Sequence, residues 1–290
     1  MLRDIKYTSP ETLADAAALL GKHGDDATII SGGQSLMPML RQRLTNYELL
    51  VDINEVQDQD YIQVDGDELR IGCLVRHNDV ANSETVADHC EMLAETAAEI
   101  GDTQVRNRGT ICGAVAHADP AGDPPVVATA LDAEIKSCGP DGEHAYDASS
   151  FFHGFYETEL GKDEIVTEVV FPVVEPPLGA AYQKYEPSAG AYPTATVAAV
   201  VELDGDEVAA ATLVTGAIEP GPTPMPDAEA QLEGETLTEA VVTEVAELVG
   251  DESEPMEDSD GSVEFKREIT KTLAKRALVT AIDRAGGDIE

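Results

Sequence analysis

Short apolar runs alternate with turn signals and helical stretches along the whole chain, and this pattern predicts a mixed α+β fold. The runs are four to eleven residues long and rich in Val, Ile and Ala, which is typical of buried strands. The predicted strands are Ala27–Ile30, Leu49–Ile53, Tyr61–Val64, Leu69–Gly72, Ala133–Ser137, Glu164–Phe171, Ala195–Leu203 and Val208–Ile218.

Helical spacing appears first near the amino terminus. Ser9 is placed to cap a helix and Pro10 suits its first position, followed by apolar residues on one face, namely Leu13, Ala16, Ala17 and Leu20. Gly21 or Gly24 would end this helix. Further helices are predicted near Glu91–Ile100 and Phe265–Leu278, and Gly101–Asp123 is predicted to be an irregular loop.

Turn residues divide the chain. Asp65–Glu68 and Leu203–Glu207 each predict a hairpin between alternating strands. Several prolines and a glycine cluster near Glu175 and predict a domain boundary there. We therefore expect a first domain at 1–175, with subdomains at about 1–57 and 58–175, and a second domain at 176–290.

The charge balance is extreme. The chain has 18 Lys and Arg against 57 Asp and Glu, a formal net charge of −39, so nucleic acid is not an expected partner. Such an acidic surface is typical of a halophilic protein in a high-salt cytoplasm, where salt screens self-repulsion. Residues 227–260 contain thirteen acidic residues and no basic one, whereas Glu264–Arg276 carries five basic residues. The final helix is therefore expected to face an acidic surface or a partner.

Location and metal content follow from simple features. No run approaches the ~18 apolar residues that a membrane span needs, and Asp4 and Glu11 interrupt what would be a secretory signal, so we expect a mature cytoplasmic protein. Four cysteines are spaced like no zinc or iron–sulfur ligand set and are expected to be buried or incidental thiols, namely Cys73, Cys90, Cys112 and Cys138.

Two glycine-containing segments carry the candidate chemistry. Ser31-Gly32-Gly33-Gln34-Ser35 joins a strand to a helix, and adjacent glycines allow backbone N–H groups to form a nest for a phosphate or pyrophosphate. A plain tight turn is the alternative, and the segment matches neither the dinucleotide fingerprint nor the Walker loop.

The second segment runs from Arg106 to Asp123 and is crowded with small residues, so its backbone could approach a ligand closely. Thr110 and Asp123 could bind hydroxyls such as those of a ribityl chain. Close packing between two subdomains is the alternative. His117, a lone histidine in this segment, is expected to make local hydrogen bonds.

Taken together, these segments resemble a known family. Ser-Gly-Gly-Gln-Ser-Leu-Met-Pro-Met-Leu and Arg-Asn-Arg-Gly-Thr-Ile-Cys-Gly-Ala-Val-Ala-His-Ala-Asp-Pro-Ala-Gly-Asp resemble the two flavin-pyrophosphate motifs of the FAD-binding medium subunit of the xanthine dehydrogenase and carbon monoxide dehydrogenase (molybdenum hydroxylase) family. Tyr182–Tyr185, Ala189–Tyr192 and Phe265–Leu278 also resemble that family. The chain departs from it at Cys112 and Ala114, where Gly and Asn are common, and at Ala191, where an acidic residue is frequent.

The resemblance implies a two-subdomain FAD domain of the vanillyl-alcohol oxidase type, followed by a small domain with a three-stranded sheet and helices. It implies that the backbone of Gly32–Leu36 and Thr110–Ala114 holds the pyrophosphate, that Asp123 lies near ribityl or ribose hydroxyls, Tyr192 near the flavin ring and Lys184 near its polar edge. The implied cofactor-binding residues are Ser31, Gly32, Gly33, Gln34, Ser35, Leu36, Thr110, Ile111, Cys112, Gly113, Ala114, Asp119, Asp123, Lys184 and Tyr192.

The function implied is an electron relay with no catalytic residue of its own. FAD would collect electrons from a small subunit with [2Fe–2S] clusters, while a large molybdopterin subunit oxidises the substrate, and pass them to an external acceptor. Two alternatives remain at this point. They are a self-sufficient FAD oxidase, which needs a base over the flavin ring, and a non-redox scaffold in which the glycines merely turn the chain.

Overall fold

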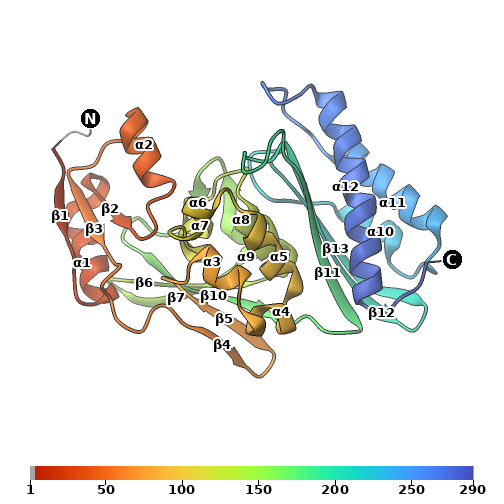
Figure 1. Cartoon of the computed structure of the whole chain (residues 1–290), viewed down its shortest axis with the longest axis horizontal. Helices are drawn as coiled ribbons and strands as arrows, with labels where there is room; N and C mark the ends of the chain where they lie inside the picture. The colour runs from red at the N-terminus through yellow and green to blue at the C-terminus, as the bar shows by residue number, and fades with distance from the viewer. Residues whose placement is uncertain (1–3, 290) are drawn as a thin grey trace.

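The computed structural model describes residues 4–289, and it confirms the predicted mixture of helices and sheets. Three sheets of three to five strands follow one another along the chain, each with helices against it, and Figure 1 shows them from the red amino-terminal part to the blue carboxy-terminal part. No helix among the described residues is both long and apolar enough to cross a membrane.

The first sheet is small and parallel, in the order β1-β3-β2. Its elements are β1 (Lys6–Thr8), α1 (Leu13–His23), the 3-10 turn η1 (Gly24–Asp26), β2 (Ala27–Ile30), α2 (Leu36–Gln42) and β3 (Leu49–Asp52). The predicted end of α1 at Gly24 is confirmed, with φ +55°. The predicted start is wrong, because Thr12 is the cap and accepts a hydrogen bond from the backbone of Asp15. Ser9 instead donates to the carbonyl of Asp52 at the end of β3.

The second sheet is antiparallel, in the order β4-β5-β10-β6-β7. Its strands are β4 (Ile62–Asp65), β5 (Glu68–Gly72), β6 (Glu134–Gly139), β7 (Gly142–Asp147) and β10 (Ile165–Pro172), and β8 (Phe152–Gly154) pairs with β9 (Glu157–Thr158) beside it. The predicted hairpin around Asp65–Glu68 is confirmed. Helices in this part are α3 (His77–Ala81), α4 (Glu84–His89), α5 (Glu91–Glu99), α6 (Thr103–Arg106), α7 (Ile111–His117), α8 (Asp123–Ala130) and α9 (Ala148–Phe151).

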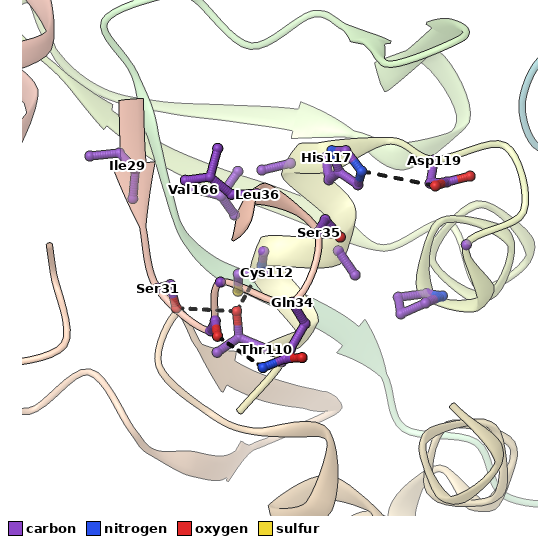
Figure 2. A pocket seen from close by; sticks show the side chains of 18 of the residues that line it. Ile29, Ser31, Gln34, Ser35, Leu36, Thr110, Cys112, His117, Asp119 and Val166 are labelled. Carbon is purple, nitrogen blue, oxygen red and sulfur yellow. Dashed lines mark hydrogen bonds and ion pairs between the residues drawn. The ribbon is translucent and has the colours of Figure 1, made fainter. Parts of the chain in front are cut away.

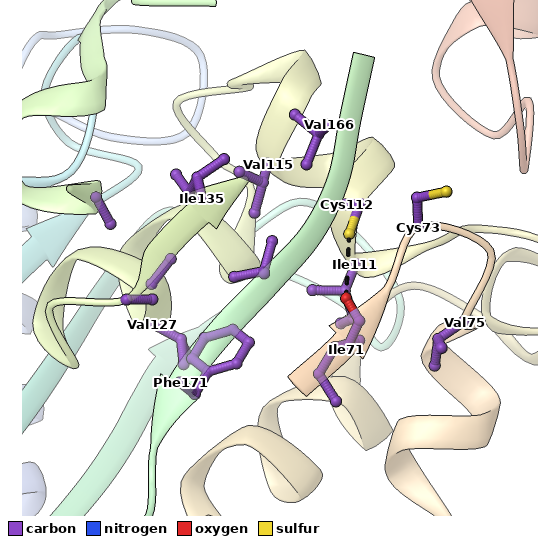
Figure 3. Packing of buried hydrophobic residues seen from close by; sticks show 14 of the residues in the cluster. Ile71, Cys73, Val75, Ile111, Cys112, Val115, Val127, Ile135, Val166 and Phe171 are labelled. Carbon is purple, nitrogen blue, oxygen red and sulfur yellow. Dashed lines mark hydrogen bonds between the residues drawn. The ribbon is translucent and has the colours of Figure 1, made fainter. Parts of the chain in front are cut away.

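Two of these helices correct a prediction. Gly101–Asp123 is not an irregular loop, because it contains α6 and α7. The Thr110 side chain caps α7 by accepting from the backbone of Gly113, 3.1 Å away. Ile111, Cys112 and Val115 form its buried face, packed on the second sheet as Figure 3 shows. The sequence pattern did not predict α7, because its glycine and alanine residues weaken the amphipathic pattern.

The third sheet, in the order β11-β12-β13-β14, belongs to the carboxy-terminal domain. Its elements are β11 (Leu178–Tyr185), β12 (Ala195–Asp204), β13 (Glu207–Gly216), β14 (Thr223–Pro224), α10 (Pro226–Leu232), α11 (Glu239–Glu252) and α12 (Val263–Arg284). The hairpin predicted around Leu203–Glu207 joins β12 to β13. The two-residue strand β14 adds a fourth strand to the three expected. The boundary predicted near Glu175 falls in the connection between β10 and β11.

The third sheet is buried on both faces, which fixes it to the rest of the molecule. One face contributes Ala180, Ala198 and Val200 to the core shared with the second sheet and its helices. The other face, with Val197 and Val201, packs in a separate core beneath the helices α10 to α12. The carboxy-terminal domain therefore cannot move away without exposing apolar surface of both domains.

The lysines of α12 confirm the expected contact with acidic surface. Lys271 lies 2.8 Å from Glu247 and 3.2 Å from Asp251 on α11, and Lys266 donates to Asp258 at 2.5 Å.

Candidate cofactor-binding site

A cavity of about 590 Å³ lies where the loop after β2 meets the amino-terminal end of α7. Figure 2 shows this meeting, with Ser31 and Gln34 of the first loop facing Thr110 and Cys112. Most predicted site residues line the cavity, namely Ser31, Gly32, Gly33, Gln34, Ser35, Leu36, Thr110, Cys112, Gly113, Ala114, Asp119, Asp123 and Tyr192. Ile111 is fully buried in the core instead, and Lys184 lies behind the wall.

The first loop presents a row of backbone donors. Gly33 has φ +71°, a conformation that glycine adopts without strain. Within the described part of the chain, the N–H groups of Gly32, Gly33, Gln34 and Ser35 have no hydrogen-bond acceptor. Unpaired N–H groups that follow one another around a bend favour an anion. The loop therefore has the donors that the phosphate prediction requires.

The two loops touch through backbone, and this contact requires glycine. A Cβ on Gly32 would lie 2.2 Å from the carbonyl oxygen of Arg108 and 2.7 Å from the Cα of Gly109. The hydroxyls of Ser31 and Thr110 are 3.3 Å apart and join the loops on the cavity side. The two loops are thus closely packed, as the alternative considered from the sequence expected, and a cavity lies beside their contact.

Arg76 and Asn54, which the sequence analysis did not identify, form a hydrogen-bonded brace that links the two loops. The Arg76 guanidinium donates to the carbonyl of Arg108 at 2.8 Å and to the Asn54 side chain at 2.6 Å. Asn54 in turn donates to the carbonyl of Ser31 at 2.9 Å. Neither Arg76 nor Asn54 lies in a glycine-rich segment, so no local signal marks them in the sequence.

Asp123 is held by two residues of the carboxy-terminal domain. Its carboxylate accepts from the Tyr182 hydroxyl at 2.5 Å and from Lys184 at 3.2 Å, and both members of the ion pair are nearly fully buried. Lys184 also donates to the carbonyl of Glu99. Burial raises the pKa of Asp123, while Lys184 and Tyr182 act in the opposite direction. The lysine thus contacts the cavity only through Asp123.

The other end of the cavity is aromatic and open. Tyr192 and Tyr156 line it with more than half of each residue exposed. The His117 ring lies 5.0 Å from the Tyr156 ring, and its Nε2 is 3.9 Å from Asp119. Burial lowers the pKa of His117. Asp119 is close to His117 in the sequence but Tyr156 is not, and the His117 ring faces the cavity (Figure 2).

Of the apolar wall of the cavity, only Leu36 was predicted. Ile29, Val166 and Leu36 face the cavity in Figure 2, and Leu20, Leu160 and Ile165 extend the same wall. In the sequence the other five positions resemble ordinary strand and helix core. Gly190 and Ala191 also line the cavity, and they belong to a segment that the family resemblance had marked.

The residues present fit FAD. Free backbone donors and a glycine contact that excludes any Cβ suit a pyrophosphate, while the apolar wall and the open aromatic end leave room for ring systems. Cys112 does not disturb this arrangement, because its thiol is buried and donates to the carbonyl of Ile71, 3.6 Å away (Figure 3). Burial raises its pKa well above the ordinary value, so it stays a thiol. Cys73 and Cys90 are likewise free and buried, as predicted.

Comparison with known proteins agrees with this geometry. A family model described as the FAD binding domain in molybdopterin dehydrogenase matches residues 3–174, and one described as the CO dehydrogenase flavoprotein C-terminal domain matches residues 180–281. The chain is 34% identical over 276 residues to the carbon monoxide dehydrogenase medium chain of Hydrogenophaga pseudoflava, covering 95% of this chain and 96% of that one. It is 33% identical over 275 residues to the glyceraldehyde dehydrogenase medium chain of Sulfolobus acidocaldarius, covering 95% and 97%.

The fold gives the same result. The solved structure of a carbon monoxide dehydrogenase from Hydrogenophaga pseudoflava, which lacks the Mo-pyranopterin moiety of its molybdenum cofactor, contains a chain with a TM-score of 0.95 at 34% identity, covering 98% of this chain and 99% of that one. The protein is thus a flavoprotein with FAD as its cofactor, and a subunit of an oxidoreductase. It belongs to the family of FAD-binding medium subunits of molybdenum hydroxylases, which includes the medium chains of carbon monoxide dehydrogenase and the FAD-binding subunits of xanthine dehydrogenase.

Proposed function

We propose that this protein is an electron relay in the cytoplasm, carrying FAD between the iron–sulfur clusters of a partner and an external acceptor. The observation that supports it most directly is the cavity itself, which is lined at one end by the free backbone donors of the first loop and is open at the end that Tyr156 and Tyr192 line. Bound there, FAD supplies the ability to take up electrons singly and to release them in pairs.

Each part of the cavity then has its own task in binding. The backbone of Gly32–Leu36 and of Thr110–Ala114 holds the pyrophosphate, and Asp123 accepts from ribityl or ribose hydroxyls. Tyr192 lies beside the flavin ring at the open end. Lys184 acts as a positioning residue, because it fixes the Asp123 carboxylate rather than lining the cavity.

The domain organisation belongs to the same proposal. The FAD domain comprises 1–175 and is of the vanillyl-alcohol oxidase type, with subdomains at about 1–57 and 58–175 and the cofactor between them. The contact of Gly32 with Arg108 joins these subdomains at the cavity. Residues 176–290 form the carboxy-terminal domain, which completes the site through Tyr182 and Lys184.

A large molybdopterin subunit and a small [2Fe–2S] subunit are the proposed partners, and the proposal assigns the metal centres to them. The medium chains that the protein resembles support this, because by their names they belong to dehydrogenases of carbon monoxide and of glyceraldehyde. Within residues 4–289, no group of three or more His, Cys, Asp or Glu side chains is arranged to hold a metal ion.

One observation favours a second candidate, the self-sufficient FAD oxidase. His117 lines the open end beside Asp119, and burial keeps its imidazole neutral by lowering its pKa, so it has the position and the protonation state of a base. Under this alternative the isolated chain would oxidise an organic substrate without partners.

Co-expression tests the proposed partners. When the protein is produced with the genes that adjoin its own, we expect a stable assembly with a large molybdenum-containing chain and a small iron–sulfur chain, detected by size-exclusion chromatography and metal analysis. The chain produced alone is the control. Recovery of the chain by itself from the co-expressing cells would contradict the assignment of partners.

A further inference from the structure

His77 is a buried cavity residue that the sequence analysis assigned to no site. It is the first residue of α3, only 4% exposed, and lines the cavity together with Gly109 and Thr110. Its backbone N–H donates to the carbonyl of Gly109 at 2.9 Å, which fixes the residue against the second loop.

The two ring nitrogens have different surroundings. Nδ1 is sealed from solvent and has no hydrogen-bond partner among the described residues. Nε2 lies on the Gly109 side, 3.0 Å from the place that a Cβ on Gly109 would take. Any side chain at 109 would displace the imidazole, so the glycine leaves room for the ring at the cavity wall.

These surroundings determine where the proton sits. Burial, together with the nearby Arg106 and Arg76, lowers the pKa of His77 to about 4, so the imidazole is neutral at neutral pH and carries one N–H. A proton on Nδ1 would be a buried donor without an acceptor, which costs more than an Nε2–H that reaches a group in the cavity. The Nε2–H tautomer is therefore favoured.

We propose that His77 is a further FAD-binding residue, whose Nε2–H donates to an oxygen of the cofactor's pyrophosphate beside Gly109. The inference rests on the proposed location of the pyrophosphate between the two loops. Gly109 contacts Gly32 of the first loop as well as His77, so all three lie around one point of the cavity wall. A neutral donor there adds a directed hydrogen bond to the backbone donors of the first loop.

Three substitutions separate this role from simple packing. Glutamine places its amide nitrogen near the position of Nε2, whereas the shorter asparagine places it near Nδ1 and leucine offers no donor. In apo-protein titrated with FAD and followed by flavin fluorescence, we expect H77L and H77N to bind roughly 10- to 100-fold more weakly, since a hydrogen bond to a charged group is lost. H77Q should stay within a few-fold of wild type.

ADP binding and NMR spectra of the wild-type protein provide two further tests. ADP shares the pyrophosphate but lacks the flavin, so H77L should weaken ADP binding by a similar factor. In wild-type protein labelled with ¹⁵N-histidine, long-range ¹H–¹⁵N spectra should show His77 protonated at Nε2 both without and with FAD, and FAD should shift that proton downfield.

Several results would overturn the inference. An Nδ1–H tautomer in the FAD complex would do so without any variant, and so would equal FAD affinity of wild type, H77N and H77L. If H77L lowers the affinity for FAD but leaves the affinity for ADP unchanged, the proposed contact of His77 with the pyrophosphate is contradicted. A wild-type chain that binds no FAD would instead contradict the proposed function, so the two failures are distinguishable.

Discussion

Gly32→Ala should abolish most FAD binding while leaving the chain folded. The added Cβ would lie 2.2 Å from the Arg108 carbonyl oxygen, so the loops must separate at the point where they form the cradle. The neighbouring atoms are backbone atoms held by the Arg76 brace and cannot rotate away. Overpacking of this kind costs about 2–3 kcal/mol, which corresponds to roughly 30- to 150-fold weaker binding. The flavin content of the purified variant and its FAD dissociation constant measure the effect.

Gly21→Ala is the matched control for this prediction. The atom nearest to a Cβ on Gly21 would be 3.4 Å away, which is an ordinary contact, and the residue lies in α1 away from the loops. Its flavin content should equal that of wild type. A folded Gly32→Ala protein with the full complement of FAD would show that the contact between the loops does not form the cofactor site.

Lys184→Met should destabilise the fold by about 3 kcal/mol or more, because it leaves the Asp123 carboxylate buried without its ion-pair partner. The variant should also bind FAD more weakly, since Asp123 lines the cavity. Chemical denaturation of the apo-proteins gives the first effect and titration with FAD gives the second.

The pH dependence of stability shows whether the unpaired Asp123 carboxylate causes the destabilisation of Lys184→Met. Burial already raises the pKa of Asp123, and loss of the lysine removes a group that opposes this rise. A carboxyl whose folded-state pKa is raised favours the folded state when protonated, and this contribution is lost as pH rises through that pKa. The deficit of Lys184→Met relative to wild type should therefore be larger at pH 8 than at pH 5.

The double variant Asp123→Asn with Lys184→Met serves as control, because asparagine still accepts from the Tyr182 hydroxyl and carries no charge. It should recover part of the lost stability at pH 8, and its deficit should not change with pH in this way. A deficit of Lys184→Met that is the same at both pH values would indicate lost packing of the lysine rather than an unpaired carboxylate.

The strands and the first glycine loop could be predicted because their signals are local. Apolar runs such as Leu49–Ile53 and Ala195–Leu203 are bounded by turn residues, and they appear in the structure as β3 and β12. Gly32 and Gly33 were identifiable because adjacent glycines between a strand and a helix allow a backbone conformation that other residues avoid. The family resemblance extended these local signals to an ordered pair of loops.

What could not be predicted depends on contacts across the fold. The second loop contains α7, whose small residues give no clear helical pattern until Ile111 and Val115 pack on the second sheet. Arg76 and Asn54 brace loops that lie far from them in the sequence. Lys184 was expected near the polar edge of the flavin, and the sequence could not show that its side chain is buried against Asp123 of α8 and Glu99 of α5.

Anaerobic reduction of the flavin tests the electron-relay proposal most directly. The isolated chain and the assembly with its partners are mixed in turn with carbon monoxide, aldehydes and purines, and flavin absorbance is followed over time. The proposal predicts that a substrate bleaches the flavin in the assembly and that none does so in the isolated chain. Reduction of the isolated chain by an organic substrate, with turnover when oxygen is admitted, would contradict the relay and support the self-sufficient oxidase.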